Sequence, residues 1–158
     1  MDEAAKKTVL RMFSYGLYVV TLNAGGALHG FTANWLTQAA FEPPSLIMAV
    51  ENDSRSLEML RANPAFAVNV LESGQRELAG TFGRSSKKIA DKMQGIAYHT
   101  GVTGCPLLDA ALGSVECEAQ ILQVCGDHTL VMGRIVEASI QREAEPLTMK
   151  ETGFRYFG

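Results

Sequence analysis

The spacing of apolar side chains changes along this chain, and each change marks a predicted secondary-structure element. Residues Asp2–Phe13 carry apolar side chains at a rough helical spacing, which predicts a helix that packs on a neighbouring sheet or subunit. The pattern then becomes strand-like, with runs rich in β-branched and aromatic residues between glycine and proline turns. The predicted strands lie in Tyr15–Asn23, Gly30–Pro44, Ser45–Val50, Ala65–Leu71, Ser114–Ile121 and Thr129–Ile140.

Short helical patterns and one long loop connect these strands. Asp53 or Ser54 is suited to cap a helix that stops at Asn63-Pro64, because proline cannot continue it. The predicted helices are Leu57–Ala62, Ser73–Phe82 and Lys87–Met93, and the predicted loop is Gly95–Pro106.

The strands fit an antiparallel barrel. Ser114–Ile121 alternates apolar and polar residues without interruption, as expected for a strand with one buried face. A doubly wound parallel sheet also alternates strands with helices, but no G-x-G-x-x-G fingerprint of its dinucleotide-binding form follows the first strand. We therefore expect a mainly β (α+β) protein, a single domain over residues 1–158, built as an antiparallel barrel with peripheral helices. The last segment, with Phe154, Tyr156 and Phe157, is expected to pack against it.

Composition and charge limit which kinds of partner and which cellular location we expect for this protein. The chain has 158 residues, of which 47% are hydrophobic and 20% charged, which suits one globular domain. A net charge of −3 and no long lysine or arginine run disfavour nucleic acid and anionic membranes as partners. No apolar run approaches the ~20 residues that span a bilayer, and the N-terminus lacks the apolar core of a secretory signal. The three cysteines, Cys105, Cys117 and Cys125, form no C-x-x-C, so we expect no disulfide framework, no metal site and a cytoplasmic location.

Residues Thr32–Gln38 carry the first candidate chemistry. Side chains alternate faces in a strand, and here neither face is uniformly apolar or charged. Short polar side chains, backbone N–H groups and the single tryptophan suit the wall of a pocket for a flat, partly apolar ligand. The alternative is an edge strand that enters a turn before Pro43-Pro44.

Two separate turns combine hydroxyl groups with cationic side chains. Asn52–Ser56 precedes a predicted helix, so its free backbone N–H groups, serine hydroxyls and Arg55 would form an anion site. The alternative there is plain helix capping. Gly83–Lys88 is the most positive stretch, and Arg84 with the lysines after it would neutralise a phosphate. The alternative there is an exposed basic turn that binds nothing.

Four segments of this sequence, in order and in register, resemble the flavin reductase-like FMN-binding split-barrel family. The resemblance runs from about Tyr15 to Tyr156, and it is strongest to the flavin domains that some anaerobes fuse to a rubredoxin. The segments are T-A-N-W-L-T-Q-A-A-F-E-P-P-S-L at Thr32–Leu46, A-F-A-V-N-V-L at Ala65–Leu71, E-L-A-G-T-F-G from Glu77, and G-D-H-T-L-V-M-G-R-I-V at Gly126–Val136.

The resemblance implies a fold and an activity. The fold would be a six-stranded antiparallel Greek-key split barrel that forms a homodimer and holds FMN, with FAD possible, near the subunit interface. The activity would be that of an NAD(P)H:flavin oxidoreductase, with NADH or NADPH as donor and flavin or a partner such as a monooxygenase as acceptor. The alternative is a flavoprotein electron carrier with tightly bound FMN that serves a rubredoxin or an iron acceptor.

The resemblance also assigns roles to individual residues. His128 would lie beside the flavin ring where nicotinamide docks, steering it or supplying a proton, and the alternative is an imidazole bonded within the Asp127 turn. By their positions in predicted loops, His29 and His99 are expected at the surface. The cofactor-binding residues would be Thr32, Ala33, Asn34, Trp35 and Leu36 at the ring, Thr37 and Gln38 near the ribityl chain and phosphate, Ser54, Arg55 and Ser56 at the phosphate turn, and Phe82, Gly83, Arg84 and Lys88 in a second wall.

Overall fold

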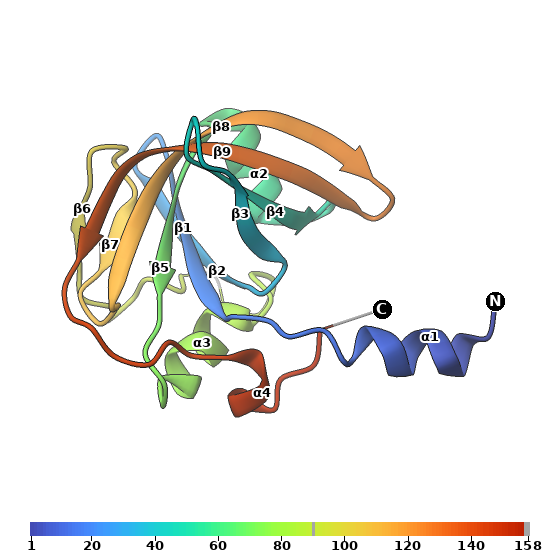
Figure 1. Cartoon of the computed structure of the whole chain (residues 1–158). Helices are drawn as coiled ribbons and strands as arrows, with labels where there is room; N and C mark the ends of the chain where they lie inside the picture. The colour runs from blue at the N-terminus through green and yellow to red at the C-terminus, as the bar shows by residue number, and fades with distance from the viewer. Residues whose placement is uncertain (90, 157–158) are drawn as a thin grey trace.

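An antiparallel sheet curled into a half-barrel forms the body of the protein (Figure 1). The structure is a computed structural model that describes residues 1–89 and 91–156. In this part of the chain the sheet has seven strands in the order β2-β1-β5-β8-β9-β4-β3, and every neighbouring pair is antiparallel. The strands are β1 Tyr18–Ala24, β2 Ala27–Ala33, β3 Leu36–Ala40, β4 Ser45–Glu51, β5 Ala65–Val70, β8 Gly113–Cys125 and β9 His128–Ile140.

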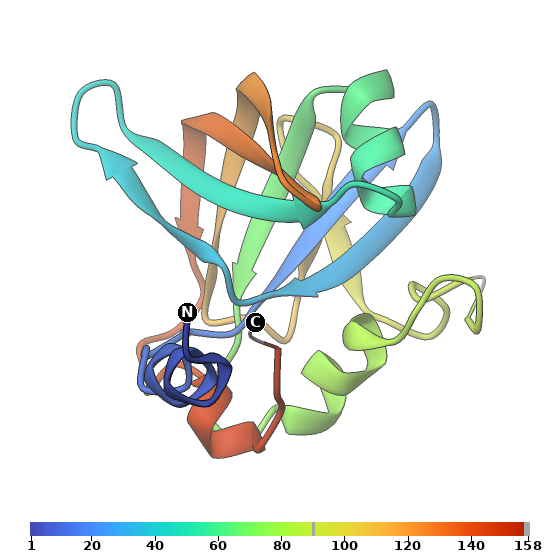
Figure 2. The same cartoon turned by 90° about the vertical axis from the view of Figure 1, so that its right-hand side faces the viewer.

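The two edges of this sheet are joined by a very short piece of chain. Edge strand β2 ends at Ala33 and edge strand β3 begins at Leu36, so only Asn34 and Trp35 lie between them. Three Cα–Cα steps of about 3.8 Å span at most roughly 11 Å, so the edges must meet here. Figure 2 shows β2 and β3 meeting at this corner and diverging beyond it, which leaves the barrel split.

The strand count therefore corrects one expectation. The antiparallel barrel with peripheral helices is confirmed, but the segment predicted as one strand, Gly30–Pro44, forms parts of two strands at opposite edges of the sheet. The described sheet thus has seven strands and not six. Neither glycine nor proline lies between Phe31 and Phe41, so the local sequence gives no sign of the change of edge.

Alternate side chains of β1 serve two cores. Val20 points into the barrel, where it packs with Phe66 and with Leu57 of α2. Val19 points to the outer face and packs with Phe82 of α3. Two of the helices, α2 and α3, therefore pack against opposite faces of β1. The helices are α1 Glu3–Leu10, α2 Arg55–Ala62, α3 Arg76–Gly83 and α4 Met149–Thr152.

Helix α1 extends away from the barrel (Figure 1). Asp2 caps it, since its Oδ1 accepts hydrogen bonds from the backbone N–H groups of Ala4 and Ala5 at 2.9 and 3.1 Å. None of its residues is buried within this chain. The helix is present as predicted, and its apolar side chains are left available to a partner.

Two segments differ from the sequence-based expectation. The predicted loop Gly95–Pro106 contains β6 Tyr98–Thr100, which pairs with β7 Pro106–Leu108 in a small separate hairpin. Three-residue strands are too short to show a period-two alternation, so the sequence could not predict this hairpin.

The described residues of the predicted helix Lys87–Met93 form turns and bends instead, and residue 90 lies outside the described part. Phe157 also lies outside it. Among the helices that the structure describes, none has the length and apolar character needed to cross a membrane.

Candidate functional site

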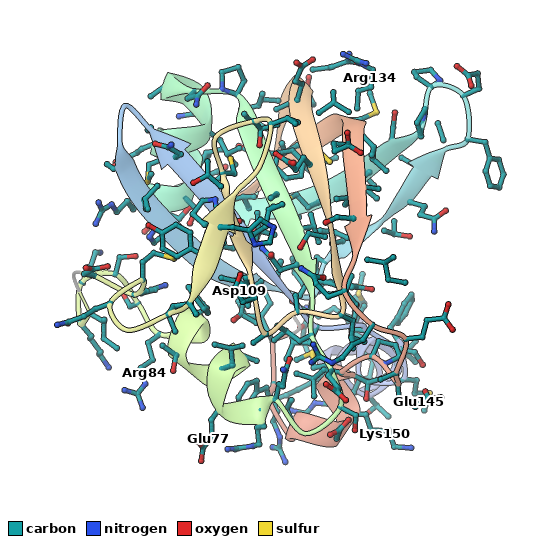
Figure 3. The ribbon with its side chains drawn as sticks, turned by 90° about the vertical axis from the view of Figure 1, so that its left-hand side faces the viewer. Glu77, Arg84, Asp109, Arg134, Glu145 and Lys150 are labelled. Atoms are coloured by element: carbon teal, nitrogen blue, oxygen red, sulfur yellow. The ribbon has the colours of Figure 1, made fainter. Side chains whose placement is uncertain are left out.

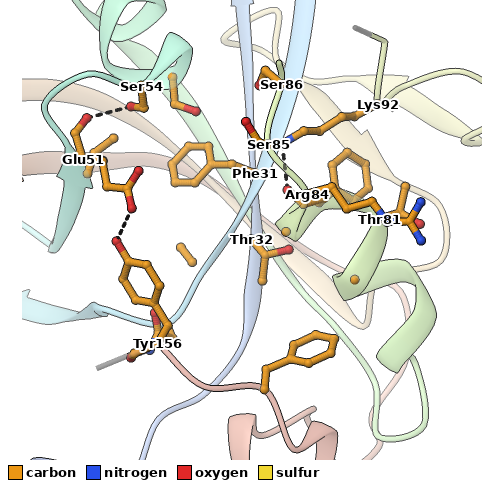
Figure 4. Close-up of a pocket in the computed structure, with 18 of the residues that line it drawn as sticks. Phe31, Thr32, Glu51, Ser54, Thr81, Arg84, Ser85, Ser86, Lys92 and Tyr156 are labelled. Atoms are coloured by element: carbon orange, nitrogen blue, oxygen red, sulfur yellow. Dashed lines mark hydrogen bonds between the residues drawn. The ribbon is translucent and has the colours of Figure 1, made fainter. Parts of the chain in front are cut away.

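A cleft of about 1390 Å³ opens beside the corner where β2 meets β3 (Figure 4). Its walls come from β2, the end of β4, the first turn of α2, the end of α3 with the loop after it, and the C-terminal segment. Segments far apart in the sequence therefore meet here. The predicted cofactor-binding residues that line it are Thr32, Ala33, Asn34, Trp35, Ser54, Arg55, Ser56, Phe82, Gly83 and Arg84.

The other predicted residues lie elsewhere. Leu36 and Thr37 border a second pocket of about 590 Å³, on the other side of Trp35. Gln38 and Lys88 are exposed and are not among the residues that line either pocket. The structure thus brings the early part of the Thr32–Gln38 segment to the cleft, because the chain leaves the cleft when β3 begins.

Two of the predicted ring contacts already have partners within the chain. The Thr32 hydroxyl donates to the carbonyl oxygen of Ala79 in α3 at 2.5 Å, which ties β2 to that helix. The buried Asn34 amide Nδ2 donates to the carbonyl oxygen of Tyr156 at 3.2 Å and lies 3.1 Å from Met149 Sδ. Asn34 thus holds the C-terminal segment across the cleft, a contact between residues 122 positions apart.

Trp35, Glu51 and Tyr156 line one end of the cleft, and His128 lies behind them. The Tyr156 hydroxyl lies 2.7 Å from Glu51 Oε1 and 2.8 Å from His128 Nε2. The Trp35 ring packs against the rings of His128 and Tyr156, with centroid distances of 4.9 Å and 5.3 Å respectively. Burial, followed by the hydrogen bond to Glu51, raises the pKa of Tyr156, so this side chain stays a neutral phenol that donates to the carboxylate.

His128 is positioned from both sides. Its Nδ1 lies 2.7 Å from Asp127 Oδ1, and its Nε2 faces the Tyr156 hydroxyl. The hydrogen bond to His128 lowers the pKa of the exposed Asp127 carboxyl. The predicted bond within the Asp127 turn is therefore present, and the imidazole lies behind Tyr156, which itself lines the cleft.

The part of the cleft between the start of α2 and the end of α3 is cationic and rich in hydroxyl groups. Ser54 caps α2: its Oγ accepts from the Leu57 N–H at 3.2 Å and donates to the Glu51 carbonyl at 2.7 Å. Arg55 and Ser56 follow it in the first helical turn, and Arg84 projects from the end of α3 on the facing wall (Figures 3 and 4).

Two further residues at this end were missed from the sequence. Lys92 is 6% exposed, and its Nζ donates to the carbonyl oxygen of Phe82 at 2.9 Å. Burial and then the Arg55 charge lower the pKa of Lys92. His29 was expected at the surface but is only 3% exposed, with Nε2 at 3.1 Å from Ser56 Oγ. Burial, then Lys92, then Arg55 lower the pKa of His29 to about 4.

Little in the sequence indicates that His29 and Lys92 lie at the cleft. His29 lies one position before the Gly30–Pro44 segment, and the strand that contains it starts earlier than predicted, at Ala27. Lys92 lies in a stretch with no regular structure, and only the fold brings it beside α2. His99 was also predicted at the surface; it is exposed on β6 and bonds Asp109 at 2.9 Å, so that expectation is confirmed.

These features define the class of protein. It is a split antiparallel barrel whose open side holds a cleft with a cationic end and an aromatic end. The residues that line the cleft fit a flavin nucleotide, because such a ligand joins a phosphate, which suits the cationic end, to a flat ring, which suits the aromatic end. The profile of the family described as "Flavin reductase like domain" matches residues 10–158, and the chain belongs to this family. The resemblance read from the sequence is thereby confirmed.

Individual relatives agree with this assignment. An "NADH-dependent FAD reductase" of Streptomyces globisporus is 32% identical over 158 residues, which cover 99% of this chain and 86% of that protein. A "High molecular weight rubredoxin" of Moorella thermoacetica is 29% identical over 141 residues, covering 88% and 62%. The solved structure of a Streptomyces globisporus C-1027 NADH:FAD oxidoreductase, in complex with NAD and FAD fragments, superimposes with a TM-score of 0.85 at 31% identity, covering 99% and 93%.

Some relatives are much longer than this chain. A Rhizobium meliloti protein named "Probable flavin reductase" is 32% identical over 135 residues, which cover 85% of this chain but 42% of the relative. The chain therefore spans less than half the length of that curated relative.

Proposed function

We propose that this protein is an NAD(P)H:flavin oxidoreductase that binds FMN, or FAD, in the cleft and takes electrons from NADH or NADPH. The observation that carries the proposal is the polarity of the cleft, with Arg55, Arg84 and Lys92 near one end and Trp35 with Tyr156 at the other. Its volume of about 1390 Å³ exceeds the ~300–1,000 Å³ of ordinary ligand pockets, which leaves room for a second nucleotide.

The cationic end would hold the phosphate. Guanidinium groups and hydroxyls bind phosphate oxygens through charge-assisted hydrogen bonds. Arg55 and Ser56 approach from α2, and Arg84 approaches from the facing wall. Lys92 is held beneath them by its bond to Phe82 and adds a further positive charge.

The corner of the sheet would hold the ring. Ala33 is small and buried, so the backbone at the end of β2 can approach a flat ligand closely. When bound, the flavin supplies the two-electron redox chemistry, and the protein binds and orients it. His128 lies behind Tyr156, so it would hold a proton next to this surface and act on the nicotinamide through the Tyr156 hydroxyl that its Nε2 contacts.

We also propose that the chain acts as a homodimer. Helix α1 buries none of its residues within the chain, and Met12 and Phe13 just after it are 72% and 59% exposed. The second pocket, bordered by Leu36 and Ile47, lies on the β3–β4 side of the sheet and offers an apolar surface to a partner. Deleting residues 1–13 should shift the protein towards monomers in sedimentation experiments without unfolding it.

A cytoplasmic location is supported by the state of the thiols. Cys105, Cys117 and Cys125 are all free in the structure, with the first two buried and the third exposed. Free thiols persist in reducing compartments.

A second candidate function is that of an electron carrier with tightly bound FMN. The likeness to a high molecular weight rubredoxin favours this candidate, with a rubredoxin or an iron centre as acceptor. FMN that survives gel filtration, slow turnover of free flavin and fast reduction of added rubredoxin would select the carrier over the reductase.

The deciding experiment is steady-state oxidation of NADH and of NADPH with added FMN or FAD. We expect turnover with at least one donor and one flavin. An Arg55→Ala variant should need more flavin to reach half its maximal rate. Absence of turnover with both donors and both flavins would defeat the reductase proposal.

A further inference from the structure

A buried imidazole lies directly beneath the cationic end of the cleft. His29 on β2 is 3% exposed, and its Nε2 is 3.1 Å from the hydroxyl oxygen of Ser56. Ser56 is 5% exposed, yet it lines the cleft. The residue whose hydroxyl the imidazole contacts is therefore itself part of the cleft wall.

The neighbouring Ser54 cannot serve an anion in the same way. A hydroxyl has one proton to donate, and Ser54 gives it to the Glu51 carbonyl at 2.7 Å while its oxygen caps α2. Beside the Arg55 guanidinium, the side-chain hydroxyl left at this turn to donate to an anion is then that of Ser56, provided that its proton is not used elsewhere.

The direction of the Ser56 proton depends on His29. If Nε2 carries the imidazole proton, it donates to Ser56 Oγ, and the hydroxyl proton is free to point into the cleft. If Nε2 is unprotonated, it accepts the hydroxyl proton, and Ser56 then presents only lone pairs to the cleft. An anion is attracted in the first arrangement and repelled in the second.

We propose that His29 is a positioning residue for the flavin phosphate, which donates from Nε2–H to Ser56 so that the Ser56 hydroxyl donates to a phosphate oxygen. The inference rests on the proposed function, because the anion at this end of the cleft is taken to be the phosphate of a flavin nucleotide.

The surroundings keep the imidazole neutral, as this arrangement requires. Burial, then Lys92, then Arg55 lower the pKa of His29 to about 4, so near neutral pH the ring is uncharged and has a single N–H. Asp53 and Glu58 also line the cleft from the side of α2, but the positive groups have the larger effect on His29. A phosphate beside Arg55 and Lys92 is stabilised further when the Ser56 dipole points its proton in the same direction.

The test compares two ligands that differ only in the phosphate. FMN and riboflavin are titrated into wild-type protein and into His29→Leu, His29→Gln and Ser56→Ala, following the quenching of flavin fluorescence. Leucine removes the donor, whereas the glutamine amide places an N–H near the position of Nε2.

We expect Ser56→Ala to weaken FMN binding about tenfold to a hundredfold, as for a lost hydrogen bond to a charged group. His29→Leu should weaken it by about twofold to tenfold, as for a lost hydrogen bond between neutral groups, and both variants should leave riboflavin binding unchanged. His29→Gln should recover most of the FMN affinity. The double variant His29→Leu/Ser56→Ala should bind FMN no more weakly than Ser56→Ala, because both changes break the same chain of donors.

Three results would overturn the assignment. They are equal losses for FMN and riboflavin in His29→Leu, no recovery in His29→Gln, and ¹⁵N NMR spectra of the wild-type protein that place the His29 proton on Nδ1. If His29→Leu does not fold, the glutamine and Ser56 variants and the NMR measurement still decide. Wild-type protein that binds neither ligand would instead defeat the proposed function.

Discussion

Replacing Gly30 with alanine tests the packing that supports the cleft. Gly30 lies in β2 under the ring of Phe82, and a Cβ there would fall 2.5 Å from Cε1 and 2.6 Å from Cδ1. Carbon atoms in contact prefer about 3.5–4.0 Å, so the overlap is about 1 Å. Phe82 is fully buried and packs with Val19 and Ala79, so its ring cannot move without disturbing that core.

The expected cost follows from this overlap. Overpacking a core by one methyl group costs roughly 1–3 kcal/mol. A domain of this length loses about 2–4 °C in Tm per kcal/mol, so a cost of about 2 kcal/mol should lower Tm by about 4–8 °C. Because the Phe82 carbonyl accepts the Lys92 Nζ hydrogen bond at 2.9 Å, a displaced Phe82 should also weaken FMN binding.

Circular dichroism melts of the flavin-free protein measure the first effect. Gly83→Ala is the matched control, since its Cβ would meet Thr32 atoms no closer than 3.8 Å and should leave Tm nearly unchanged. A second-site change, Phe82→Leu, should be less harmful in the Gly30→Ala background than in wild type, because it removes the overlapping ring atoms. A Gly30→Ala variant that melts within a degree or so of wild type would refute the reasoning.

Three further predictions concern charged and polar groups. Arg84→Ala should weaken FMN binding by up to about fivefold, as expected for the loss of an exposed ion pair, whereas Arg134→Ala, at the far end of the barrel in Figure 3, should have no effect in the same titration. Glu116→Gln should destabilise the fold by about 1–3 kcal/mol in urea denaturation, because the buried carboxylate accepts from three donors at 2.6–3.0 Å, while the exposed Glu118→Gln should cost less than about 1 kcal/mol. Of the four tyrosines, Tyr156 should still be protonated about one pH unit above the usual pKa of about 10, and ultraviolet titration of Tyr156→Phe should lack that late step. A Tyr156 that ionises with the others would show that its bond to Glu51 does not persist in solution.

Local sequence determined much of this protein. Runs such as Ala65–Leu71 and Ser45–Val50 are strands because β-branched and apolar residues fit a buried, pleated surface, and both are found nearly where they were predicted. Ser54 caps α2 because a hydroxyl before a helix satisfies a free N–H. The four family segments also identified the fold, because their order and spacing are preserved along the chain.

Tertiary structure alone decided how the cleft is built. The Asn34-Trp35 corner joins the two sheet edges, and this depends on the pairing of strands far apart in the chain. His29 reaches Ser56 across 27 positions, and Lys92 reaches the same end of the cleft from a stretch without regular structure. Burial and neighbouring charge, which lower the pKa of His29, arise only when the chain has closed around it.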